Sequence, residues 1–78
     1  MGTGEIATQI AALNKADIAF RLAEWHCQEA QTDNEQRQYA QASLRAAMQR
    51  AFILAWLEKR QIILNKMNGE YVQREYKL

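Results

Sequence analysis

The sequence predicts an all-α fold, an antiparallel hairpin of two long helices followed by a short C-terminal appendage. The 78 residues include no proline and only three glycines, and Ala, Gln, Glu, Arg and Leu, which cost little in a helix, are abundant. Apolar residues make up 49% of the chain and recur at helical spacing. We therefore expect one small folded domain that spans residues 1–78.

The run Ala51–Leu57 is seven apolar residues long and lies inside the second expected helix. Because one helical turn holds about 3.6 residues, this run leaves no polar face for almost two turns. A helix that is apolar on every side must be covered by several neighbours. We therefore expect two hairpins to associate as a homodimer in a four-helix bundle.

The first helix is expected over residues 4–31, beginning near Thr3, whose hydroxyl can cap the free amides. One face carries a heptad of larger residues with alanines on the neighbouring row, which lets a partner helix approach closely. The heptad residues are Ile6, Leu13, Phe20 and Cys27, and the alanines are Ala16, Ala23 and Ala30.

Two further sets of residues complete the first helix. Ile18, Leu22 and Trp25 form a second apolar strip, so this helix should contact neighbours on two sides. The remaining polar residues are expected to face solvent, and these are Asn14, Asp17, Arg21, Glu24 and Gln28.

A polar break over residues 31–36 separates the two helices. Thr32 with Glu35, and Asp33 with Gln36, have the spacing of a capping box. A turn this short predicts that the helices are antiparallel neighbours. Residues 1–35 hold six acidic and two basic side chains, whereas residues 36–68 hold one acidic and six basic. The acidic first helix would then lie beside a basic second helix.

The second helix is expected over residues 34–67 and should stop at Asn68-Gly69, where glycine can adopt the left-handed conformation of a helix C-terminus. The tail over residues 69–78 is ambiguous. Tyr71, Val72 and Tyr76 suit a strand, but no second strand candidate is evident, so we expect a short helix or an extended tail packed on the bundle.

His26-Cys27 is the one pair with the character of metal ligands or a nucleophile. Adjacent helical residues point about 100° apart, so the two cannot share a metal without other ligands. A Glu-x-x-His pair would need an acid where Ala23 stands. We interpret Cys27 as a core residue and His26 as partly exposed. No metal, cofactor or catalytic residue is expected, and no Ser-His-Asp set is evident in the sequence.

One mixed basic and aromatic strip of the second helix is the most informative surface. Its residues are Arg37, Arg45, Met48, Phe52, Trp56, Lys59, Ile63 and Lys66. Such a strip suits self-association, another protein or nucleic acid. The net charge of +1 disfavours the third reading, because nucleic-acid affinity depends on many cations.

The expected function is that of a small non-enzymatic interaction module, a modulator, inhibitor or assembly factor that binds a larger protein. Small helical proteins of this kind are common among phage and mobile-element products. The candidate partner-binding residues are Phe52, Trp56, Trp25, Tyr39, Tyr71 and Tyr76. The alternative is a transcriptional or recombination regulator that binds nucleic acid through Arg37, Arg45, Lys59 and Lys66.

The expected compartment is the cytoplasm. Cys27 is the single cysteine, so no intrachain disulfide can form, and the first residues lack the basic and apolar regions of a signal peptide. The longest apolar run is seven residues, against roughly 20 needed to cross a bilayer.

Overall fold

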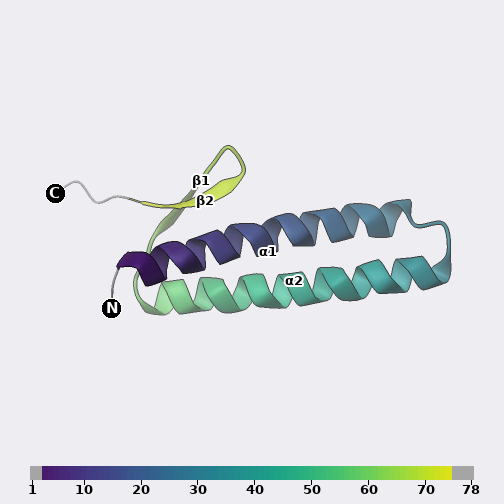
Figure 1. Cartoon of the computed structure of the whole chain (residues 1–78), viewed down its shortest axis with the longest axis horizontal. Helices are drawn as coiled ribbons and strands as arrows, with labels where there is room; N and C mark the ends of the chain where they lie inside the picture. Colours follow the sequence, from purple (N-terminus) through teal and green to yellow (C-terminus); the bar gives the residue numbers. More distant parts are fainter. Residues whose placement is uncertain (1–2, 75–78) are drawn as a thin grey trace.

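The computed structural model describes residues 3–74, which form two long antiparallel helices and a β-hairpin (Figure 1). Helix α1 spans Thr3–Glu29 and helix α2 spans Asp33–Lys59. Strand β1, Leu64–Met67, pairs with strand β2, Glu70–Gln73, and the strands lie along one side of α1. The helical hairpin is confirmed, but the all-α prediction is incomplete because it omitted the strands.

Of the two predicted capping pairs in the turn between the helices, Thr32 with Glu35 forms the cap of α2. Thr32 is the N-cap of α2 in an extended conformation, and its hydroxyl accepts a hydrogen bond from the Glu35 amide at 3.1 Å. The Thr32 carbonyl accepts a second bond from the Gln36 amide at 3.0 Å. The hydroxyl satisfies one of the amides that the first helical turn cannot pair within the helix, and the bond from Gln36 is the first of the regular helical series.

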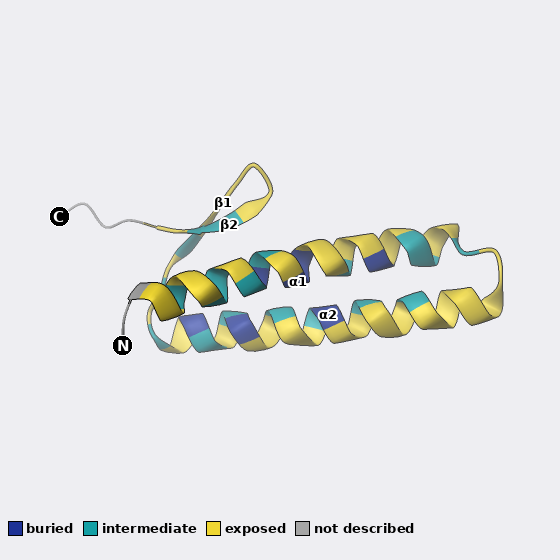
Figure 2. Cartoon of the chain, viewed as in Figure 1, coloured by how far each residue is buried: buried dark blue, intermediate teal, exposed yellow. Residues whose placement is uncertain are grey.

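The core lies along the seam between α1 and α2, where the buried residues of both helices face each other (Figure 2). Leu13 of α1 packs with Ile53 and Leu57 of α2 in one cluster. Ala16 and Ala23 of the predicted alanine row are buried, as is Ala46 of α2, whereas Ala30 is half-buried. Ile6, Phe20 and Cys27 of the heptad are half-buried.

Among the residues that the structure describes, the Ala51–Leu57 run is covered on one side only. Ile53 and Leu57 are buried, whereas the side chain of Phe52 between them is 74% exposed. Ala51 and Ala55 are also exposed. The run therefore presents a large apolar surface to solvent.

Helix α2 ends at Lys59, well before the predicted end near residue 67. Gln61 adopts a left-handed backbone with a φ of 60°, which stops the helix. The Gln61 amide donates to the Glu58 carbonyl at 2.9 Å, and the Ile62 amide donates to the Leu57 carbonyl at 3.0 Å. This pair of bonds is a Schellman motif, completed by Ile62 packing on the core that contains Leu57.

Asn68-Gly69 turns a β-hairpin and does not stop a helix. The two residues have φ angles of 55° and 80°, as a two-residue type I′ turn requires. Met67 pairs with Glu70 beside the turn, and Lys66 pairs with Tyr71 one step further. Leu64–Met67 is thus the second strand that the sequence did not reveal, and residues 70–73 form a strand and not a short helix. Tyr71 packs on the core, as expected of an extended segment on the bundle.

Candidate functional site

The most exposed apolar surface lies on α2 and is called here the α2 surface. Its large exposed residues recur at helical spacing, and a groove of about 570 Å³ adjoins them. The exposed residues are Leu44, Met48 and Phe52. The groove is lined by Phe52, Ala55, Trp56, Lys59 and Arg60. Phe52 and Trp56, two of the sequence-predicted anchors, therefore share one groove with the predicted cation Lys59.

Arg60 holds one wall of this groove in place. Its guanidinium carbon lies 3.6 Å from the centre of the Trp56 ring, a cation–π contact. Its Nη1 donates to the Trp56 carbonyl at 3.1 Å. The indole is therefore fixed by a neighbour one turn away, which lowers the entropy that it would lose on contact with a partner.

The α2 surface is bordered by cations that have no carboxylate partner within the described residues. The three ion pairs found among residues 3–74 all end on Asp17 of α1. Arg37, Arg45 and Lys59 are exposed and take part in none of them. Lys66 lies elsewhere, on β1, with its Nζ 3.6 Å from Asp17 Oδ2 and 4.7 Å from the centre of the Tyr71 ring.

A second exposed apolar row lies on α1. Ile18, Leu22 and Trp25 are all exposed. A shallow depression of about 230 Å³, lined by Ile18, Arg21 and Leu22, lies within the row. The described part of the chain leaves this predicted second apolar strip uncovered.

Of the other sequence-predicted aromatic residues, Trp25 and Tyr39 both contact the ring of His26. His26 stacks on Tyr39 at 5.0 Å between ring centres and meets Trp25 edge-on at 5.1 Å. Tyr71 was expected to remain free for a partner, but it is half-buried and packs on the core. Tyr76 lies outside the described residues. Cys27 donates from Sγ to the Gln36 carbonyl at 3.5 Å, near the turn between the helices.

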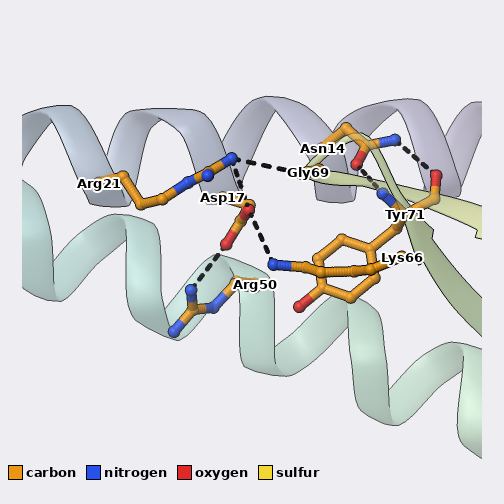
Figure 3. Close-up of polar contacts among 7 residues, drawn as sticks. All are labelled: Asn14, Asp17, Arg21, Arg50, Lys66, Gly69 and Tyr71. Carbon is orange, nitrogen blue, oxygen red and sulfur yellow. Dashed lines mark hydrogen bonds and ion pairs between the residues drawn. The ribbon is translucent and has the colours of Figure 1, made fainter.

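A buried ion cluster holds the three parts of the fold together (Figure 3). Asp17 is only 2% exposed, although we expected it to face solvent. Its Oδ1 accepts from Arg50 Nη1 of α2 at 2.8 Å. Its Oδ2 lies 3.1 Å from Arg21 Nη2 and 3.6 Å from Lys66 Nζ. Asp17–Arg50 is also the one ion pair between the helices among residues 3–74, so the expected broad pairing of an acidic with a basic helix is absent there.

Asn14 and Arg21 fasten the hairpin to α1 beside this cluster. The Asn14 amide donates from Nδ2 to the Tyr71 carbonyl at 2.9 Å, and Asn14 Oδ1 accepts from the Tyr71 amide at 2.6 Å. Arg21 Nη2 donates to the Gly69 carbonyl at 3.4 Å. Asn14 thus occupies the backbone groups of an edge strand that would otherwise stay open to another chain.

The environment of Asp17 keeps its carboxylate ionised. Burial alone would raise its pKa, but the hydrogen bond from Arg50 and the charges of Lys66, Arg21 and Arg50 outweigh it, so the pKa lies below its ordinary value of 3.8. Each contact of the carboxylate is internal and almost none of it is exposed. The cluster therefore joins the two helices and the β-hairpin and does not form a ligand-binding site.

Comparison with protein-family models, curated proteins and solved structures finds no match to this chain. Within residues 3–74, no group of three or more His, Cys, Asp and Glu side chains is placed to hold a metal ion. None of the helices in that range is long and apolar enough to cross a membrane. The exposed surfaces are therefore the features of this fold that bear on its function.

Proposed function

We propose that this protein is a small non-enzymatic interaction module that binds a larger cytoplasmic protein through the α2 surface. The observation that carries the proposal is the exposed row of Leu44, Met48 and Phe52 beside the groove that holds Trp56. Aromatic residues, Met and Arg are the types enriched at protein interfaces, and Trp and Arg dominate their energetics. An apolar surface of this kind with a basic border is a common mark of a docking site.

The charges around the α2 surface indicate the kind of partner. Between residues 36 and 57 the helix contains three arginines and no carboxylate, and Arg50 is already engaged by Asp17. An apolar partner segment with acidic borders would complement this surface. From Leu44 to Arg60 the surface runs for about 24 Å, the length of a partner helix of roughly 16 residues. Binding there would make the protein a modulator, inhibitor or assembly factor of its target.

A nucleic-acid-binding regulator is the second candidate. The exposed Phe52 ring close to cations resembles the stacking platforms that bind single strands. Lys66, however, is drawn into the Asp17 cluster, which leaves Arg37, Arg45 and Lys59 of the four predicted cations for phosphate contacts. So few cations support only weak electrostatic binding at physiological salt.

We also propose that the protein is a homodimer of four helices. The support is the apolar row left exposed on α1, which includes Ile18, Leu22 and Trp25. A chain of this size gains stability when such residues are covered by a second copy.

Capture from a lysate of the native host tests the partner-binding proposal. The wild-type chain, Phe52→Glu and the control Met67→Glu, at an exposed position of the hairpin, would each be immobilised after circular dichroism has shown equal helicity. A protein that the wild type and Met67→Glu retain, and that Phe52→Glu loses, is the expected result. Equal capture by all three chains would refute the α2 surface as the site.

A gel shift on duplex and single-stranded DNA separates the second candidate. Binding should be absent or weak at both 50 and 200 mM salt, since few phosphates are contacted. Submicromolar binding at the lower salt that is lost at the higher would favour the regulator instead.

A further inference from the structure

The outer side of α1 carries an apolar row with a positive charge at one end and a negative charge at the other. The row and its two charges, called here the α1 strip, are Lys15, Ile18, Leu22, Trp25 and Glu29. At about 100° per residue, these five positions fall within an arc of about 80°. All five side chains are exposed. Neither Lys15 nor Glu29 takes part in an ion pair within residues 3–74.

We infer that the α1 strip is the surface on which a second copy of this chain docks, with the two α1 helices antiparallel and a twofold axis at Leu22. The inference rests on the proposed dimer and names its interface. In such a self-complementary contact each residue faces the one equally far from the axis in the opposite direction. Lys15 and Glu29 each lie seven residues from Leu22. Lys15 of each copy therefore faces Glu29 of the other, which gives two matched ion pairs.

The surface relief fits the same register. The depression in the row lies on the Ile18 side of Leu22, and Trp25 lies three residues to the other side. The antiparallel arrangement brings Trp25 of the second copy to the level between Ile18 and Leu22. A large ring then meets a hollow of about 230 Å³, as in knobs-into-holes packing.

Charge excludes the α2 surface from the same role. In an isologous contact the same surface of both copies meets. On the α2 surface, this would bring Arg45 and Lys59 close to cations of the second copy, which repel them. The α1 strip has one charge of each sign and avoids this repulsion. Its use for the dimer leaves the α2 surface available for another protein.

The rest of the fold leaves room for this contact. Taking the direction of Leu13 toward α2 as zero, the strip lies about 120–200° around α1. Asn14, Asp17 and Arg21, which hold the hairpin, lie at about 40–100° on the same scale. The second copy therefore adds a helix on the free side of α1. The four helices would form one layer with the two α1 helices at its centre, which is a more open arrangement than the four-helix bundle predicted from the sequence.

A charge-swap series tests the register. Sedimentation equilibrium should show a dimer for the wild type at micromolar concentration. K15E and E29K should each weaken dimerisation about tenfold, because each turns two attractive contacts into repulsive ones. The double variant K15E/E29K should restore the wild-type constant to within about threefold, and the control E58K should leave it unchanged. Single variants as tight as the wild type, or a double variant weaker than both, would overturn the inference.

Disulfide trapping gives an independent readout. In a Cys27→Ser background, Leu22→Cys should give a covalent dimer under mild oxidation, because the two residues meet at the axis. The control Ala11→Cys should give none, because its copies would lie about 33 Å apart, far beyond the reach of a disulfide. A dimer that neither cross-links at Leu22→Cys nor responds to the charge swap overturns this interface alone. A monomer at 100 µM overturns the proposed dimer as well, while the partner-binding proposal keeps its own test.

Discussion

Replacing Asp17 by asparagine removes the charge that joins both helices and the hairpin, while it keeps the size of the side chain. Removal of one partner from a fully buried ion pair destabilises a protein by about 3–5 kcal/mol. Here the cationic side chains of Arg21, Arg50 and Lys66 are 54%, 27% and 48% exposed, so water can solvate them again once the carboxylate is gone. We therefore expect a smaller loss of about 1.5–3 kcal/mol.

That loss is a large share of the stability of a chain this small. At about 0.05–0.15 kcal/mol per residue, a domain of this length has roughly 4–12 kcal/mol in total. With about 4–8 °C per kcal/mol, the Tm of Asp17→Asn should fall by roughly 6–24 °C. Circular dichroism at 222 nm, with urea unfolding at pH 7, measures both quantities. Glu24→Gln is the matched control, because Glu24 is an exposed acid on the same helix without an ion pair in the described chain. A change below about 0.5 kcal/mol, or one equal to that of the control, would refute the role given to the cluster.

The remaining predictions concern pH, the C-terminus of α2 and the attachment of the β-hairpin to α1. The pKa of Asp17 is lower in the folded than in the unfolded chain. The stability that its charge contributes should therefore be fully present above the ordinary pKa of 3.8 and be lost as pH falls through the folded value. In acid titrations, the difference in unfolding free energy between wild type and Asp17→Asn should shrink only below about pH 4. Gln61→Gly should raise stability by about 0.5–1 kcal/mol in urea unfolding, since glycine adopts a φ of 60° without strain. A less stable Gln61→Gly would contradict the conclusion that a Schellman motif ends α2 at this residue. Asn14→Ala should free the Tyr71 amide and raise hydrogen exchange across β1 and β2 while the exchange of α2 stays unchanged; unaltered exchange in the hairpin would show that Asn14 does not hold it.

Local signals predicted the helical hairpin well. Leu13 with the alanine rows defined the seam, and the spacing of Thr32 and Glu35 defined the start of α2. These features depend on residues within a turn or two of each other, so periodicity and capping chemistry suffice to find them.

The end of α2 and the strands were missed because their signals are weak or ambiguous. Gln61 takes the left-handed position that glycine usually marks. Leu64–Met67 contains no β-branched or aromatic residue, so it did not resemble a strand. Asn68-Gly69 fits a helix C-terminus and a type I′ turn equally well when it is considered alone.

The buried state of Asp17 could not be predicted from its neighbours in the sequence. Arg50 and Lys66 reach it from two other elements, and an acid with no visible partner is expected to face solvent. The available hint was the placement of Asn14, Asp17 and Arg21 at helical spacing beside the core seam. Of the predicted interaction residues, Phe52, Trp56 and Lys59 line one groove. Tyr71 and Lys66 instead contact α1 and help to hold the β-hairpin against it.

Site-specific photo-crosslinking tests the central claim, that the α2 surface binds another protein, most directly. A photo-reactive side chain would replace Met48 of the α2 surface or, as the matched control, Met67 of the hairpin, which are 64% and 60% exposed. After irradiation in native host cells, position 48 should yield one protein adduct larger than the chain itself, and position 67 should yield none. The same adduct from both positions, or from neither, would contradict the claim.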